Sequence, residues 1–231
     1  MELFDLNGYG WLLWKGVRLT LLVGMGAMGV AMVLGLISSW GKLSSSRLAL
    51  GFANTYTTVV RGVPELVMIL LVYYGVPTLI QDLSASFGYS VTINLDPFTA
   101  GVVTLGFIYG AFSTEVFRGA LLAVPKGQIE AARAVGMGKI LAFRRIIFPQ
   151  MWRFALPGIG NVWMVLIKAT SLISIIQLPE LMRNADIASR ATQKPFTFFI
   201  IASFFYLGIT IISNLIQKKA ENWADRGVRR I

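Results

Sequence analysis

Three charged side chains, Glu65, Glu115 and Lys168, lie within long apolar segments and are the residues most suited to do chemistry. A charged side chain at the centre of a membrane span costs about 2.5–3.5 kcal/mol on insertion scales, so such residues usually face protein or water. Two acids that flank a cavity would suit a cationic solute. We therefore predict that Glu65 and Glu115 lie on a solute path or at its gate.

Lys168 has two interpretations that the sequence leaves open. It lies about 18 Å along its apolar segment at about 1.5 Å of rise per residue, which is too deep for easy snorkelling to the interface. It either forms a salt bridge between helices, with Glu115 as the candidate partner, or it lines the solute path. Arg61 and Arg118 lie near the ends of their segments. We expect them to snorkel or to pair with Glu65 or Glu115.

Composition excludes most other chemistry. The chain contains no His and no Cys, which removes His-based catalysis, imidazole metal ligands and thiolate metal sites. Among the remaining reactive residue types, no paired carboxylates and no Ser/Lys pair stand out. We therefore predict that the chain is not an enzyme and holds no metal ion.

Residues 24–29 match the G-x-G-x-x-G fingerprint of dinucleotide sites letter for letter. That fingerprint requires a strand before it and a helix after it, whereas these residues lie inside a continuous apolar segment. We predict instead that Gly24, Gly29 and Gly35 let neighbouring helices approach closely. The chain has no G-x-x-x-x-G-K-[ST] motif, so we expect it to bind neither ATP nor any other cofactor by itself.

The elements that position these residues are membrane spans. Hydrophobic residues make up 55% of the chain and charged residues 14%, and the apolar residues come in long blocks. Each block is long enough for a helix to cross a hydrocarbon core of about 30 Å. We predict an all-α integral membrane protein, one domain over residues 1–231, with five spans. They cover about residues 17–40, 59–80, 98–123, 156–176 and 196–216.

The net charge of +10 follows the membrane topology. Lys and Arg gather in residues 41–58, in residues 124–153 and after residue 216, whereas residues 81–97 contain none. The second loop on the same side of the membrane as residues 81–97 mixes cations with Glu180 and Asp186. The positive-inside rule then places the N-terminus outside and the C-terminus in the cytoplasm. The charge thus predicts topology and gives no reason to expect nucleic-acid binding.

A polar insert within residues 124–153 is more elaborate than a simple connection. Pro125 is a plausible helix start, and Gly136 and Gly138 make a flexible break between two helix-like halves. Pro149 is expected to close the second half. Basic residues and an apolar stripe share this insert. The pattern predicts a surface helix pair, exposed to the cytoplasm, that docks against another protein.

The spacing of Glu130-Ala131-Ala132, Gly136, Ile146 and Phe148-Pro149 resembles the EAA loop of ABC-importer permeases. Phe148 stands where that family usually has Leu, a like-for-like apolar change. In the family this loop forms the coupling helix, which sits in a groove of a cytoplasmic ATPase subunit. The resemblance implies that Glu130 anchors the loop, that Ala131 and Ala132 permit close packing, and that Gly136 permits the bend.

Further motifs resemble the polar amino-acid permeases within that family. They are Arg-Gly-Val-Pro at 61–64, Tyr-Tyr-Gly-Val-Pro at 73–77, Thr-Glu-Val-Phe-Arg-Gly-Ala at 114–120 and Lys-Ala-Thr-Ser-Leu at 168–172. Ala169 is typical of the histidine/lysine/arginine/ornithine and opine branch, since many other relatives have Asp there. The resemblance implies a type I ABC importer (MetI-like) permease fold and import of a basic amino acid or an opine.

The resemblance also implies the partners. They would be a second permease subunit, either a sister chain or a copy of this one, two cytoplasmic ATP-binding subunits that use ATP and Mg²⁺, a periplasmic solute-binding protein, and the lipid of a bacterial inner membrane. The alternative is a self-contained secondary transporter or channel for a small cationic solute. Such a protein would explain the spans and the buried charges, but not the spacing of the loop or the lack of an inverted repeat.

Overall fold

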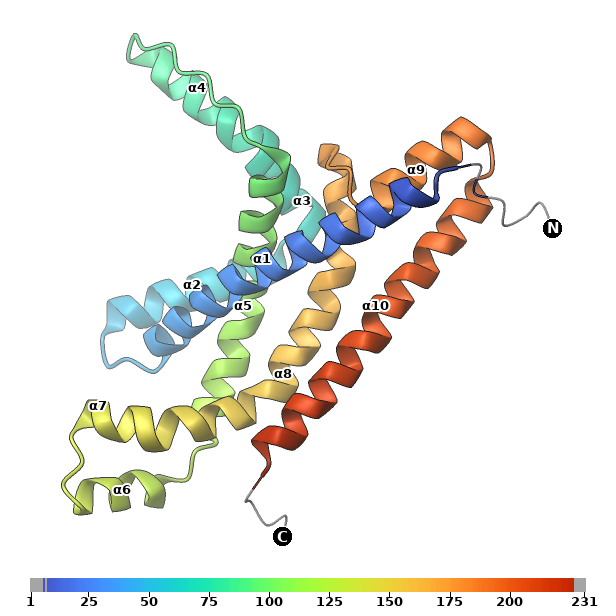
Figure 1. Ribbon diagram of the computed structural model, residues 1–231. Coiled ribbons are helices and arrows are strands. Elements are labelled where there is room, and N and C mark those ends of the chain that lie inside the picture. Colours follow the sequence, from blue (N-terminus) through green and yellow to red (C-terminus); the bar gives the residue numbers. More distant parts are fainter. Residues whose placement is uncertain (1–5, 7, 227–231) are drawn as a thin grey trace.

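The computed structural model describes residue 6 and residues 8–226, and all regular structure in this part of the chain is helical. Figure 1 shows the arrangement of the helices. The elements are α1 (Gly10–Lys42), α2 (Arg47–Gly62), α3 (Glu65–Leu70), a π-helical turn (Leu71–Gly75), α4 (Val76–Ser86), α5 (Pro97–Leu122), α6 (Lys126–Ala134), α7 (Lys139–Ala142), a second π-helical turn (Phe143–Ile147), α8 (Phe148–Ala169), a 3₁₀ helix (Thr170–Ile176), α9 (Leu181–Thr192) and α10 (Pro195–Ala224).

Five helical stretches among the described residues are long and apolar enough to cross a membrane, as predicted. They are Gly10–Lys42, Glu65–Ser86, Pro97–Leu122, Lys139–Ile176 and Pro195–Ala224. The first and last helices extend beyond the predicted spans, to Gly10–Lys42 and Pro195–Ala224.

The core lies where α1 crosses α5, and small residues set the distance between the two helices. A Cβ added at Gly35 would lie 2.6 Å from the Cβ of Ser113, and one added at Gly106 would lie 2.5 Å from the Cβ of Val30. The predicted role of Gly35 in close packing is therefore confirmed. Gly24 likewise packs against α8, but the prediction for Gly29 is wrong, because a Cβ added there would meet nothing within 4 Å.

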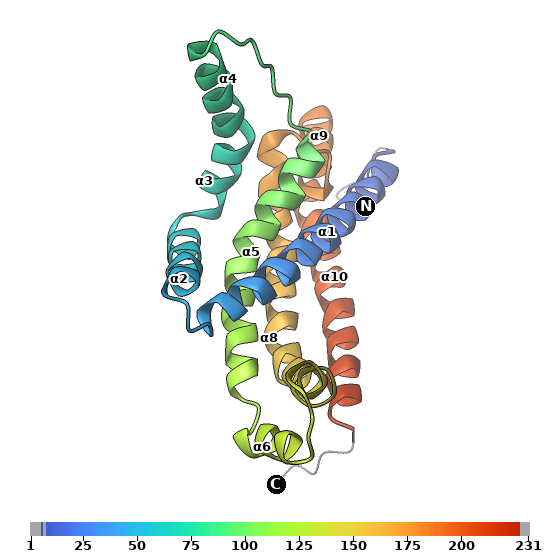
Figure 2. The ribbon, with the colours of Figure 1, turned by 90° about the vertical axis from the view of Figure 1, so that its left-hand side faces the viewer.

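The second predicted span begins too early. Residues 59–62 belong to α2, which ends at Gly62, and the chain is extended at Val63 and Pro64 before α3 begins at Glu65. A residue that precedes proline is disfavoured in the helical region, so Val63 breaks the helix. Figure 2 shows α2 beside the bundle as a separate helix below α3 and α4.

The fourth predicted span is part of a longer helical stretch. Residues Lys139–Ile176 are continuous, so the second half of the polar insert runs directly into α8. The expectation that Pro149 closes a separate helix is wrong. The π-helical turn immediately before α8 accounts for this, because such local adjustments accommodate the hydrogen bond that proline cannot donate.

Candidate functional site

The polar insert forms the predicted helix pair at one end of the bundle, opposite α4 and α9 (Figure 1). Pro125 precedes α6, and the helix is followed by Gly136 with a φ of +79°. The amide of Met137 donates to the carbonyl of Ala132 at 3.0 Å, which closes the end of the helix. The predicted start at Pro125 and the predicted break at Gly136 are therefore confirmed as structural features.

The outer surface of this pair carries apolar side chains. Val135 is 72% exposed and Ile140 is 85% exposed, one on each side of the bend. Glu130 and Ala131 are also exposed, whereas Ala132 is buried within the chain. The two alanines thus face different surroundings: Ala132 packs inside this chain, and Ala131 is available to a partner. Exposed apolar side chains on a helix pair at one end of the bundle suit docking to another protein.

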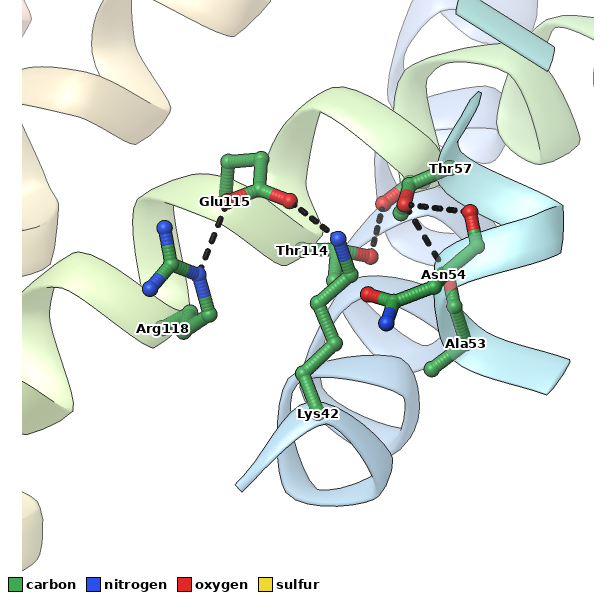
Figure 3. A network of polar contacts seen from close by, with 8 residues as sticks. Lys42, Ala53, Asn54, Thr57, Thr114, Glu115 and Arg118 are labelled. Atoms are coloured by element: carbon green, nitrogen blue, oxygen red, sulfur yellow. Dashed lines mark hydrogen bonds and ion pairs between the residues drawn. The ribbon is translucent and has the colours of Figure 1, made fainter. Parts of the chain in front are cut away.

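Glu115 forms a charged cluster with Lys42 and Arg118, shown in Figure 3. Its Oε1 accepts a hydrogen bond from Lys42 Nζ at 2.5 Å, and its Oε2 accepts one from Arg118 Nε at 2.9 Å. The predicted pairing of Arg118 with Glu115 is confirmed. Because Lys42 is the last residue of α1, the cluster joins the end of α1 to α5. In the sequence α5 is the helix that directly precedes α6.

The predicted salt bridge between Lys168 and Glu115 is wrong, since Glu115 is bonded to the other two cations. Lys168 is exposed near the end of α8 and has no ion pair or side-chain hydrogen bond within the part of the chain that the structure describes. Its side chain thus remains available for a partner or a ligand.

Glu65 lies apart from that cluster and accepts a hydrogen bond from the hydroxyl of Tyr109 at 2.9 Å. Arg61 does not pair with it. The guanidinium of Arg61 lies 5.2 Å from the ring centroid of Phe112, in a cation–π contact. The structure therefore gives Glu65 and Glu115 separate partners, and it does not bring the two acids together around a common cation.

Sequence reasoning missed the importance of Glu180, which the pattern of charges presents only as a loop acid. Its side chain is 0% exposed and caps α9, accepting hydrogen bonds from the amides of Met182 and Arg183 at 2.9 and 2.8 Å. The hydroxyls of Tyr206 and Thr20 also donate to it, at 3.1 and 3.3 Å. Burial raises the pKa of Glu180 to about 7. The available signal was an acid directly before a helix, the typical place for a cap.

Comparison with known proteins decides the family. Residues 31–226 match the family described as "Binding-protein-dependent transport system inner membrane component". The chain belongs to this family. It is therefore a multi-pass inner-membrane permease, and the self-contained transporter or channel is excluded.

Curated relatives in the predicted branch cover nearly the whole permease. The chain is 43% identical over 97% of its length to the histidine/lysine/arginine/ornithine transport system permease protein HisQ of Escherichia coli (strain K12), and the match spans 98% of that protein. It is 44% identical to the nopaline transport system permease protein NocQ of Agrobacterium fabrum (strain C58 / ATCC 33970), with 96% of this chain and 94% of that one covered. The resemblance to polar amino-acid and opine permeases is confirmed.

Solved structures confirm the fold. A structure described as an amino acid ABC transporter with histidines is 32% identical, has a TM-score of 0.81, and is matched over 96% of this chain and 98% of its own. A chain of the inward-facing MetNI methionine ABC transporter is 17% identical, with a TM-score of 0.72 and coverage of 94% and 98%. The permease therefore has the predicted type I importer, MetI-like fold.

Proposed function

We propose that this permease carries basic amino acids or opines across the membrane and that separate subunits supply the energy. The observation that carries the proposal is the match to relatives whose names specify histidine, lysine, arginine, ornithine and opines, over nearly the full chain. On this proposal the chain is a single permease domain and no enzyme. It binds no cofactor, and ATP and Mg²⁺ are used by its partners.

The proposed complex contains a second permease subunit, two cytoplasmic ATP-binding subunits and a periplasmic solute-binding protein. The N-terminus lies outside and the C-terminus lies in the cytoplasm with α6. Two features support this orientation. The basic insert is at the same end of the bundle as the end of α10 (Figure 1), and that arrangement obeys the positive-inside rule.

The helix pair around Gly136 is the proposed coupling element. Val135 and Ile140 provide exposed apolar contacts for an ATP-binding subunit, and Glu130 provides an exposed acceptor beside them. The continuous helix from Lys139 to Ile176 passes movement of this element into the membrane, because no loop separates α7 from α8. A displacement of the ATP-binding subunits can thus bias the bundle between inward-open and outward-open states.

The three charged residues have distinct proposed roles. Glu115 belongs to the gate, because two cations already neutralise it and tie α1 to α5. Glu65 lines the solute path, where its one side-chain hydrogen bond among the described residues, from Tyr109, leaves acceptor capacity for a cationic side chain. Lys168 pairs with the carboxylate that every amino acid carries, because its ammonium is exposed and has no ion pair within the described part of the chain.

Solute-stimulated ATPase activity of the complete complex in liposomes tests the proposal. Basic, acidic and neutral amino acids would each be presented with the cognate binding protein. We expect stimulation by basic solutes and none by acidic ones. Glu65→Gln should reduce stimulation while basal hydrolysis persists. Equal stimulation by all three classes would contradict the proposed substrate class, and copurification without any ATPase would contradict the proposed complex.

A further inference from the structure

A groove with a cationic rim lies along the N-terminal half of α1. Figure 1 shows this part of α1 at the end of the bundle opposite α6. The volume of the groove is about 410 Å³. The walls are apolar, and the polar groups are confined to a few side chains. It is lined from α1 by Leu12, Lys15, Arg18, Leu19 and Leu22, and from α9 by Asn184.

The two cations of this groove are exposed and one helical turn apart. Within the residues that the structure describes, neither Lys15 nor Arg18 has an ion pair or a side-chain hydrogen bond. The Nζ of Lys15 lies 5.7 Å from the ring centroid of Trp11. Two adjacent cations beside an apolar wall attract a ligand that is anionic at one end and apolar at the other.

Tryptophans place the groove at the membrane interface. Trp11 and Trp14 are 66% and 55% exposed, and they lie on the same stripe of α1 as Lys15 and Arg18. Indole rings are enriched at the level of lipid headgroups, where one side is apolar and the other wet. Leu22, 46% exposed, continues the stripe towards the hydrocarbon region.

The buried amide of Asn184 forms the α9 side of the same groove. Asn184 is 1% exposed, and its Nδ2 donates to the carbonyls of Leu12 and Pro179, at 2.9 Å in each case. This fixes the orientation of the amide and leaves its Oδ1 without a donor in the described part of the chain. The oxygen is itself covered by neighbouring atoms, so Asn184 holds α9 against α1 and adds polarity to the wall without offering an open acceptor.

We propose that the groove binds one anionic phospholipid. Its phosphate lies between Lys15 and Arg18, and an acyl chain follows Leu19 and Leu22 into the membrane. Phosphatidylglycerol is an anionic phospholipid of this kind, and its charge suits the two cations. An acidic protein partner would pair with the cations equally well, but it would give no reason for the exposed indoles or for the apolar wall.

The test is the melting temperature of the full-length chain, with the subunits that copurify with it, in detergent with added lipid. Phosphatidylglycerol and phosphatidylcholine with identical acyl chains are compared. For phosphatidylglycerol at about 100 times its Kd we expect Tm to rise by about 5–11 °C. Phosphatidylcholine and inorganic phosphate should produce a much smaller rise. In Lys15→Gln/Arg18→Gln the two lipids should raise Tm by the same small amount.

A matched control removes two cations elsewhere. Lys218→Gln/Lys219→Gln lowers the net charge by the same amount near the C-terminal end of α10, away from the groove. This variant should keep the full response to phosphatidylglycerol. If the first double variant does not fold, Lys15→Arg/Arg18→Lys retains both charges and should respond as the wild type does. An equal response in the wild type and Lys15→Gln/Arg18→Gln would overturn the proposal. The proposal would also be overturned if Lys15→Gln/Arg18→Gln kept the lipid response of the wild type but lost affinity for the solute-binding protein. The two cations would then belong to an interface with a protein partner.

Discussion

Glu115 and Glu180 each tie α1 to neighbouring helices, but different chemistry satisfies the two carboxylates. Glu115 binds two cations, Lys42 and Arg118, and its side chain is 26% exposed. Glu180 is fully buried and is held by two amides and two hydroxyls, with no Lys or Arg nitrogen within ion-pair distance among the described residues. Thr20 and Lys42 are the corresponding attachment points on α1.

This difference indicates a division of labour between the two ends of the molecule. A partly exposed ion pair is weak and reversible, so the cluster at the coupling end can form and break during a cycle. A buried carboxylate that satisfies a helix cap and links three helices is costly to disturb. Under the proposed function, the α9 end would be the fixed part of the subunit and the end that contains α6 would be the moving part.

The largest expected effect is on stability, at the fixed end. Glu180→Ala leaves the amides of Met182 and Arg183 and two buried hydroxyls without an acceptor, so we expect a loss of about 3 kcal/mol. This corresponds to a decrease in Tm of about 6–12 °C for a chain of this size, measured by thermal unfolding in detergent. Glu180→Gln keeps one acceptor oxygen and should lose less than half as much. An unchanged Tm in Glu180→Ala would show that this end is not the fixed one.

The second effect is the pH dependence that Glu180 confers. Its pKa is raised from 4.5 to about 7 in the folded protein, so the folded state binds its proton more tightly than the unfolded state does. The resulting stabilisation is fully present below about pH 4.5 and is lost as the pH rises through 7. Between pH 5.5 and 7.5 the loss amounts to about 2 kcal/mol.

Unfolding measured at these two pH values checks the prediction. Other groups also titrate, so the quantity to compare is the difference between the wild type and Glu180→Gln, which has no proton to lose. We expect the wild type to lose more stability than the variant as the pH rises. Parallel pH profiles would mean that the carboxyl keeps an ordinary pKa despite its burial.

The third effect concerns the moving end and should appear in transport instead of stability. Gly136 has a φ of +79° and open space around it, so Gly136→Leu costs about 1–2 kcal/mol in backbone strain without a clash. We expect insertion to remain intact and uptake to fall about tenfold or more relative to hydrolysis, because the bend that presents Val135 and Ile140 changes. Uptake and ATP hydrolysis measured together in liposomes report the ratio.

Gly138 supplies the matched control. It lies in the same bend and also has open space around it, but its φ is −64°, which any residue adopts. Gly138→Leu should therefore leave coupling close to that of the wild type. Normal uptake by Gly136→Leu would remove the left-handed bend from the coupling element, and equal losses in the two variants would point to side-chain size instead of backbone conformation.

Local patterns in the sequence predicted those features of the fold and of the candidate site that depend on neighbouring residues. The apolar blocks indicated five spans, and the proline and glycines of the polar insert indicated the start of α6 and the bend after it. Even the break between α2 and α3 was encoded locally by Val63-Pro64, but the apolar residues on both sides concealed it. Pro149 misled in the opposite sense, since a π-helical turn let the helix continue through it.

Contacts between distant segments could not be predicted in the same way. The partner of Glu115 on another helix is Lys42, and that pairing depends on how α1 lies across α5. The crossing is set by close approach at Gly35 and Gly106, and nothing in the sequence gives the register of one helix on another. Glu180 is a similar case, because its burial results from α1 and α10 enclosing the first turn of α9.

The smallest expected effect tests the reversibility of the ion pair. Glu115→Gln removes a partly exposed carboxylate, so we expect a loss of only about 0.5 kcal/mol, or about 1–2 °C in Tm. The loss should shrink in 1 M salt, where the Debye length is about 3 Å, whereas the loss in Glu180→Ala should not. Lys42→Met combined with Glu115→Gln should cost less than the sum of the single changes, since both remove the same interaction. A loss of several kcal/mol that is insensitive to salt would make Glu115 a second fixed anchor. The coupling end would then have to move as a rigid body with α1 instead of releasing it.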